Sequence, residues 1–320
     1  LGCDPGHDPK TGPARVRPAA LTGGLRGIGP QRGIALVLVL WILLLVTIST
    51  GAYTLTARMD TLEAHTVLSG TQARMGAEAG LNLAVMSLRD PDETTRLIPD
   101  GRPYSVVFDD MLVEVRVTDE RGKLDLNQAD ENTLINLLTG NGLDGQDATL
   151  LAAAIKDWSD SDEIERANGA ELEAYEAAGL AVGPANRPFI MTEELLQVLG
   201  MSWTLYTQIE PGVTVHSRAA LPNPAYAPAE ALLALPDMTG EEALNFVAQR
   251  HSEESLTDLD LVLPGGEVAM ARGRGVTYSI VAKATLPNGI WDQVDATIRL
   301  GANSNGRPYT VLRWREGTHQ

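Results

Sequence analysis

The apolar positions at the start of the chain form one unbroken run that later becomes periodic. Residues 34–46 read IALVLVLWILLLV, and no charged residue occurs from Ile34 until Arg58. This stretch exceeds the roughly 20 residues that a helix needs to cross a bilayer. Five later residues recur at the spacing of one helix face: Ala77, Leu81, Ala84, Val85 and Leu88. The pattern predicts one helix over about 34–90, apolar all round at first and amphipathic at its end.

Alternating apolar and polar residues predict strands in two separate parts of the chain. Residues 104–108 and 111–118 flank Asp109-Asp110, and valine stands at every other position in the middle of the second segment. The alternation returns in three segments near the C-terminus: 276–284, 294–300 and 309–314. One apolar face per strand is typical of an antiparallel sheet that is covered on one side. We therefore expect an antiparallel sheet against which the amphipathic end of the helix packs.

Between the two groups of strands, the pattern over 121–265 is helical and partly repeated. Ala129–Ile135 and Ala227–Leu233 share the frame A-x-x-x-x-L-[IL], and a related piece, Thr192–Met201, lies between them. These pieces resemble helix-hairpin-helix or SAM-like repeats, although unrelated helical hairpins can share the same leucine spacing. The expected fold class is α+β: a long N-terminal helix packed on an antiparallel β-sheet, with a large inserted all-α domain that contains these repeats.

Charge is distributed unevenly along the chain. The formal net charge is −17, and residues 119–267 contain 27 Asp and Glu against 7 Lys and Arg. A surface of this sign repels phosphate backbones and suits divalent cations or basic partners. We therefore expect no nucleic-acid partner. The repeats leave open one alternative, a membrane-anchored periplasmic helix-hairpin-helix protein that binds DNA during uptake.

The densest group of candidate ligands is an acidic run within the helical part. Five carboxylates lie close together in the sequence, with Glu171 and Glu173 nearby: Asp157, Asp160, Asp162, Glu163 and Glu165. Such hard oxygen ligands suit Ca²⁺, which takes about six to eight oxygens. The run lacks the glycine and the closing glutamate of an EF-hand loop, and a solvated acidic loop is the alternative. From the residues alone both readings stay open; if the run holds an ion, Asp157, Asp160 and Asp162 are the first candidate ligands, followed by Glu163 and Glu165.

The sequence contains few signs of enzymatic chemistry. It has no Walker loop, no G-x-S-x-G and no H-E-x-x-H sequence. Trp158, Trp203 and Trp291 are predicted to be core residues, and His216 is predicted to be structural. We therefore expect a protein that is not an enzyme. The alternative is an anchored hydrolase that uses the acidic run together with a metal.

The residues around the apolar run bear on two alternatives for the N-terminus: an ordinary signal peptide and a prepilin leader. Arginines before the run predict a cytoplasmic N-terminus and an exported C-terminus. Thr50-Gly51-Ala52 could serve an ordinary signal peptidase. Gln31-Arg32-Gly33, however, directly abuts the run, and this junction resembles the leader of prepilins, which the prepilin peptidase cuts after glycine on the cytoplasmic side. The resemblance implies cleavage between Gly33 and Ile34 and a methylated new N-terminus.

Three later blocks of sequence narrow the resemblance from prepilins in general to one family. Asp119–Asn127, Ile155–Asp162 and Pro222–Pro228 resemble, in this order, blocks of the family of type II secretion minor pseudopilin K (GspK). The fifth residue after Gly33 is Leu38, where most pilins carry a glutamate, and this family is known for lacking that glutamate. The resemblance extends from about residue 31 to the last predicted strand.

The resemblance implies an architecture, a location and partners. The parts are a cleaved leader, a transmembrane and assembly helix, the first part of the pilin sheet, the inserted α-domain and the rest of the sheet: 1–33, 34–90, 91–120, 121–265 and 266–320. A single-pass protein of the inner membrane of a Gram-negative bacterium is implied, mostly periplasmic, with its leader cytoplasmic before cleavage. Its implied partners are the prepilin peptidase, the minor pseudopilins I and J, and calcium bound in the α-domain. Its implied role is to prime or cap the pseudopilus tip for export of folded proteins across the outer membrane.

Overall fold

The computed structural model describes residues 34–92, 95–252, 262–263, 265–266, 275–301 and 306–317. The chain divides into two compact units, Leu1–Glu63 and Ala64–Gln320. Gly33 and the rest of the predicted leader lie outside the described residues.

Helix α1 (Ile34–Leu88) begins where the apolar run begins and ends two residues before the predicted boundary. In the described part of the first unit, every side chain of α1 is exposed, and the helix is long and apolar enough to span a membrane. In the second unit, α1 buries the predicted face, and all five residues of that face are buried. The predicted change from an all-round apolar helix to an amphipathic one is therefore confirmed.

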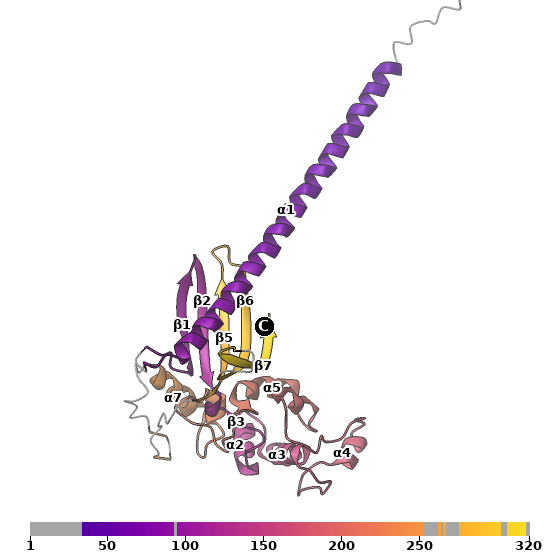
Figure 1. Ribbon diagram of the computed structural model, residues 1–320. Helices are drawn as coiled ribbons and strands as arrows, with labels where there is room; N and C mark the ends of the chain where they lie inside the picture. The colour runs from indigo at the N-terminus through magenta and orange to yellow at the C-terminus, as the bar shows by residue number, and fades with distance from the viewer. Residues whose placement is uncertain are drawn as a thin grey trace, which may run out of the picture. The chain divides into compact units, whose positions relative to one another are not determined.

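The second unit contains the antiparallel sheet that the alternating segments predict. Its five strands are β1 (Asp100–Phe108), β2 (Met111–Asp119), β5 (Thr277–Thr285), β6 (Trp291–Leu300) and β7 (Tyr309–Glu316). They lie side by side in the order β1-β2-β5-β6-β7, each antiparallel to its neighbour (Figure 1). Every second residue of β2 is buried, as expected for a strand with one covered face.

Small residues allow α1 to lie very close to this sheet. A Cβ atom at Gly76 would lie 2.9 Å from the Cβ of Ala284, and a Cβ at Gly80 would lie 2.6 Å from Cγ1 of Val113. Both glycines therefore lie at positions where a methyl group has no room. Because Gly76 also faces Met111, at the start of β2, α1 runs along β2 from its first residue toward its last.

The helical part of the chain is an insertion between two paired strands. Asp119 at the end of β2 is the register partner of Tyr278 in β5. The chain leaves the sheet at one residue and returns beside it. The inserted helices are η1 (Glu120–Gly122), α2 (Glu131–Gly140), α3 (Gly145–Ser159), α4 (Leu172–Ala177), η2 (Thr192–Gln197), α5 (Trp203–Ile209), η3 (Glu210–Gly212), α6 (Ala229–Leu232) and α7 (Gly240–Ser252). Two short strands, β3 (Leu124–Asp125) and β4 (Val213–Thr214), pair in parallel within the insertion.

Buried apolar residues of the second unit form separate clusters. The first joins α1 to the sheet. The second includes residues of α2, α3, α4 and α5. The third surrounds α6 and α7. The helix and sheet thus have a core of their own, which is the usual condition for a domain that tolerates an insertion.

The repeated frames form helices of unequal length. Ala129–Ile135 leads into α2, a helix of 10 residues whose N-terminus is capped by Asp130, whereas Ala227–Leu233 gives α6, with 4 residues. The residues that directly follow the two frames contact each other: the Nδ2 of Asn136 donates to the carbonyl oxygen of Ala234 at 3.5 Å. The assignment to helix-hairpin-helix or SAM-like repeats stays a prediction.

The prediction that three tryptophans belong to cores is confirmed only for Trp158. Trp158 is buried between Tyr175 and Phe189. Trp291, the first residue of β6, is half-buried, belongs to none of the core clusters and has Nζ of Lys283 4.4 Å from its ring centroid. Trp203, the first residue of α5, is 67% exposed. Among the aromatic pairs of the described residues, its ring contacts only that of Tyr206, one turn further along the same helix. An aromatic residue on the outer side of a short helix has no core to enter.

Candidate functional site

The acidic run begins inside the last turn of α3. The Asp144 side chain caps the start of this helix, and its apolar face, which includes Leu151 and Ile155, is buried. Asp157 lies on the same inward side and is fully buried, next to Trp158. A carboxylate at this depth needs partners, because an isolated buried charge is very costly.

Asp157 obtains those partners from the loop that follows. Its Oδ2 accepts hydrogen bonds from the backbone N–H of Ala170 at 2.9 Å and of Arg166 at 3.3 Å. A Cβ at Gly169 would lie 1.9 Å from this oxygen, so the chain needs glycine to pass the carboxylate this closely. Burial raises the pKa of Asp157 even though these amides oppose the shift.

Arg166 bridges two carboxylates of the acidic run. Its Nε lies 3.2 Å from Oδ1 of Asp157, and its Nη2 donates to Oδ2 of Asp160 at 3.0 Å. Asp160 is also the C-cap residue of α3. The structure therefore brings the first two predicted ligands together around one guanidinium.

The other predicted ligands lie further out. Asp162 is exposed and accepts a hydrogen bond from the backbone N–H of Ile164 at 2.9 Å. Glu163 and Glu165 are also exposed. Among the described Asp, Glu, His and Cys side chains, no three meet in a ready-made metal site.

Two further oxygens belong to this region. Glu171 begins α4 as its N-cap and is only 7% exposed, and Asn186 is joined to α3 by a hydrogen bond from its N–H to the carbonyl of Trp158 at 3.0 Å. Burial, followed by the negative charges of Asp157 and Asp160, raises the pKa of Glu171. The sequence shows Glu171 near the acidic run, but it gives no signal for Asn186, because a loop brings that residue back.

Four buried oxygens of these side chains accept no hydrogen bond among the described residues, and only the first has an ion-pair contact, with Arg166: Oδ1 of Asp157, Oδ1 of Asp160, Oε1 of Glu171 and Oδ1 of Asn186. Carboxylate and amide oxygens are the ligands that Ca²⁺ prefers. Buried polar atoms without partners are uncommon and call for an explanation. The donor set therefore fits a calcium ion, although Arg166 contacts two of the same carboxylates in this structure.

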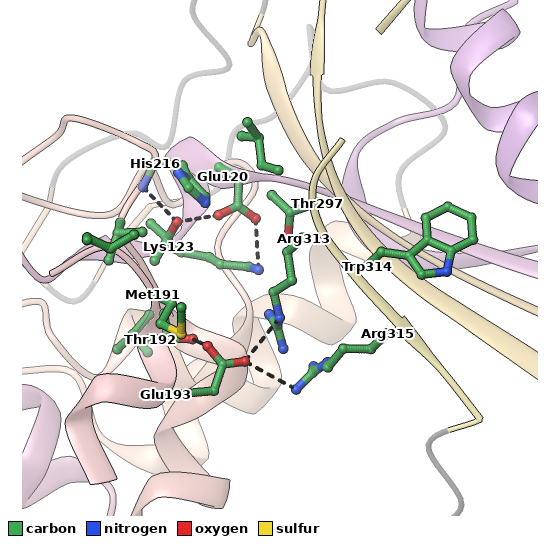
Figure 2. Close-up of a pocket in the computed structure, with 15 residues that line it drawn as sticks. Glu120, Lys123, Met191, Thr192, Glu193, His216, Thr297, Arg313, Trp314 and Arg315 are labelled. Atoms are coloured by element: carbon green, nitrogen blue, oxygen red, sulfur yellow. Dashed lines mark hydrogen bonds and ion pairs between the residues drawn. The ribbon is translucent and has the colours of Figure 1, made fainter. Parts of the chain in front are cut away.

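A second polar region lies where the insertion meets the sheet (Figure 2). Here a cavity of about 290 Å³ is lined by residues around η1, η2 and β4 and by strand β7. Glu120 is buried at its edge, where it accepts hydrogen bonds from the hydroxyls of Ser279 and Thr214 and pairs with Nζ of Lys123 at 2.9 Å. Burial opposes ionisation, but Lys123 and these hydroxyls outweigh it and lower the pKa of Glu120.

The opposite wall of this cavity carries a second set of ion pairs. Arg313 and Arg315 of β7 reach Oε1 of Glu210 at 2.7 Å and 2.9 Å, and Arg313 also pairs with Glu193 at 3.2 Å. Figure 2 shows both arginines pointing from the strand toward Glu193. Burial lowers the pKa of His216, which faces the same cavity. The charged groups here pair with one another across the boundary between the insertion and the sheet. They hold the two parts together, and this region is called the joint between insertion and sheet below.

Comparison with known proteins gives consistent matches. Residues 112–218 match the family model of type II secretion system (T2SS) protein K. The type II secretion system protein K of Klebsiella pneumoniae is 31% identical over 204 residues, which cover 57% of this chain and 62% of that protein. The protein of the same name from Pectobacterium carotovorum subsp. carotovorum is 29% identical over 252 residues, covering 69% of this chain and 75% of that protein.

A solved structure shares the fold. The match is to the crystal structure of the GspK-GspI-GspJ complex from the type 2 secretion system of enterotoxigenic Escherichia coli, with a TM-score of 0.54 and 17% identity. It covers 80% of this chain and 100% of that chain. At this identity the likeness concerns the fold.

Proposed function

We propose that the chain is a member of the family of type II secretion system protein K and a minor pseudopilin at the tip of the pseudopilus. In this role it primes or caps the filament that exports folded proteins across the outer membrane. The α+β fold, the apolar N-terminal helix and the likeness to a chain of the GspK-GspI-GspJ complex support this proposal.

The observation that carries the proposal is the point at which the insertion leaves the sheet. Helix α1 runs along β2 toward Asp119, and the insertion begins directly after Asp119. The inserted helices therefore lie beyond the end of the sheet toward which α1 runs (Figure 1). A body of this size prevents another subunit from stacking on that end, as a tip position requires.

The N-terminal part of α1 is the proposed membrane anchor and assembly helix. We propose that the prepilin peptidase cuts between Gly33 and Ile34, that the new N-terminus is methylated, and that one span holds the protein in the inner membrane with its bulk in the periplasm. N-terminal sequencing of the membrane-extracted protein tests this. A mature end at Ile34 supports the proposal, whereas an end near Tyr53 indicates ordinary signal peptidase and contradicts it.

Leu38 is consistent with a subunit at the tip of the filament, on which no further subunit stacks. A glutamate at the fifth mature position is useful when it can pair with the amine of a neighbouring subunit, and it is costly in lipid when it cannot. Leu38→Glu should therefore give no gain in secretion over the wild type, while the matched change Leu38→Ile should leave secretion unchanged. A gain in secretion from Leu38→Glu would indicate a subunit of the filament body.

The proposed partners are the minor pseudopilins I and J of the same system. Their binding is tested by co-expressing the three chains, extracting them with detergent and separating them by size-exclusion chromatography. One complex that contains all three chains is the expected result, and leaving out I or J should remove it. Elution of this chain apart from both others would overturn the partner assignment.

Calcium is the proposed ligand of the acidic loop. Asp157, Asp160 and Glu171 would hold it, with Asn186 and Asp162 as further oxygen donors. A bound ion supplies positive charge that ties the end of α3 to the start of α4. Thermal unfolding of the full chain should move to higher temperature with Ca²⁺ and return with a chelator, because a ligand that binds only the folded state stabilises it. Mg²⁺ at the same concentration is the control.

A further inference from the structure

The guanidinium of Arg166 lies between the carboxylates that a cation would need. Its Nε is 3.2 Å from Oδ1 of Asp157, the oxygen that the loop amides leave unused, and its Nη2 is 3.0 Å from Oδ2 of Asp160. We propose that Arg166 is a built-in counter-ion, which holds the acidic loop closed when no metal is bound and which a divalent cation displaces. The inference deepens the proposed calcium site and rests on it.

Arg166 leaves part of the negative charge uncompensated. It bonds neither Oδ1 of Asp160 nor Oε1 of Glu171, and both atoms are buried without a hydrogen-bond donor among the described residues. Glu171 contributes its carboxylate from a different element and is more than nine-tenths buried. The guanidinium thus pairs with two carboxylates, while the charge of the third, Glu171, lies close to both of them, and a doubly charged ion balances the three better.

Arg166 can leave at small cost. Its side chain is 43% exposed, while that of Asp157 is fully buried, so the arginine can move into water and the aspartate cannot. The nearby amine of Lys156 donates to the carbonyl oxygen of Ala129 at 3.0 Å and is held away from the acidic oxygens. Arg166 is therefore the group that exchanges with the metal.

This exchange makes two effects of Arg166→Gln opposite in sign. Without metal, the variant leaves Asp157 and Asp160 without their cation, so it should unfold at a lower temperature than the wild type. With metal, the competitor is absent, so the affinity should rise by about 1.4- to fivefold, the range expected for loss of a partly exposed ion pair. The rise in melting temperature on adding Ca²⁺ should consequently be larger in the variant.

The test uses the full-length chain in detergent micelles. Ca²⁺ binding is measured by calorimetry, and Tb³⁺ binding by luminescence sensitised by the neighbouring Trp158, with Trp158→Phe showing which indole is responsible. Arg116→Gln is the matched control, because Arg116 is similarly exposed and paired with Glu114 on the sheet, away from the loop. Glu171→Gln should weaken binding of both ions without lowering the melting temperature of the metal-free protein.

Each outcome decides between exchange and another role. Tighter binding in Arg166→Gln, with no change in Arg116→Gln, supports exchange. Weaker binding in Arg166→Gln means that the arginine positions the ligands, and overturns the inference. No effect of Ca²⁺ or Tb³⁺ on the wild type overturns the site itself, but it leaves the assembly with I and J to its own test.

Discussion

Arg250, fully buried near the end of α7, donates a hydrogen bond from Nη2 to the carbonyl oxygen of Asp100 at 3.1 Å, and its Nε lies 3.4 Å from the Asp100 carboxylate. Its Nη1 donates to the carbonyl oxygens of Pro224 and Ala227 at 2.7 Å and 2.8 Å. Burial lowers the pKa of Arg250 to about 10, which leaves it charged at neutral pH. One side chain therefore joins helix α7 to strand β1.

Replacing Arg250 should destabilise the second unit strongly. Arg250→Met removes the donor to three buried carbonyl oxygens, and the expected loss is about 3–5 kcal/mol of unfolding free energy. Arg250→Lys should recover only part of it, because one ammonium cannot match the planar fork. Thermal unfolding checks both, with Arg116→Met as the exposed control. A loss below about 1 kcal/mol for Arg250→Met would show that this contact does not hold the two parts together.

An added methyl group should destabilise the protein at Gly80, whereas one at Gly70 should be tolerated. A Cβ at Gly80 would lie 2.6 Å from Cγ1 of Val113 and 3.1 Å from Cγ2 of Val115, while a Cβ at Gly70 meets nothing within 4 Å. Gly80→Ala should cost about 1–3 kcal/mol of unfolding free energy, reduced by the better helix propensity of alanine. Gly70→Ala should stabilise by about 0.5–1 kcal/mol. Denaturant unfolding compares them, and equal effects at both sites would refute the close approach of α1 to the sheet.

Acid should weaken the joint between insertion and sheet through Glu120. Its pKa lies below the ordinary value of 4.5 in the folded state, so its contribution to stability is complete above that value and is lost as the pH falls through the folded-state pKa. Glu120→Gln should lower the melting temperature at pH 7, because it leaves Lys123 without its partner.

The difference between wild type and Glu120→Gln should then shrink as the pH falls from the ordinary pKa of 4.5 through the lower folded-state pKa of Glu120. Melting curves at a series of pH values measure it, with Glu114→Gln on the exposed face of the sheet as the control. A difference that stays constant with pH would mean that Glu120 contributes through shape and not through charge.

The helix and the sheet could be predicted because their signals are local. The spacing of Ala77 and Leu81 fixes a helix face, and the alternation in β2 fixes a strand face within a few residues. The site is different. Asp157 and Asp160 are visible as an acidic run, but their contact with Arg166 depends on a turn that Gly169 permits, and Asn186 returns to α3 through a loop.

The insertion also limits what the sequence alone can give. Nothing local to Asp119 or Tyr278 indicates that they are register partners, because the segments that carry them are far apart in the chain. The prediction that Trp203 is a core residue was wrong for a similar reason: the identity of a residue does not show whether a short helix directs it toward the core.

Closing the sheet without the insertion should yield a folded pilin-like unit. Because Asp119 and Tyr278 are paired, a two-residue Asn-Gly turn between them can replace residues 120–277 and form a hairpin of β2 and β5. Every residue of the core between α1 and the sheet lies outside the deleted segment, so strand content and cooperative unfolding should persist.

The shortened chain should be less stable than the full protein, because it loses the bonds from Arg250 to Asp100. Its control lacks Asp119 as well, with the same turn after Thr118. That shift of one residue directs the apolar side chains of β2 to the wrong face of the sheet and should abolish cooperative unfolding. If the in-register closure also fails to fold, the helix and sheet depend on the insertion for their stability. If it folds, its failure to support secretion would assign the tip role to the inserted helices.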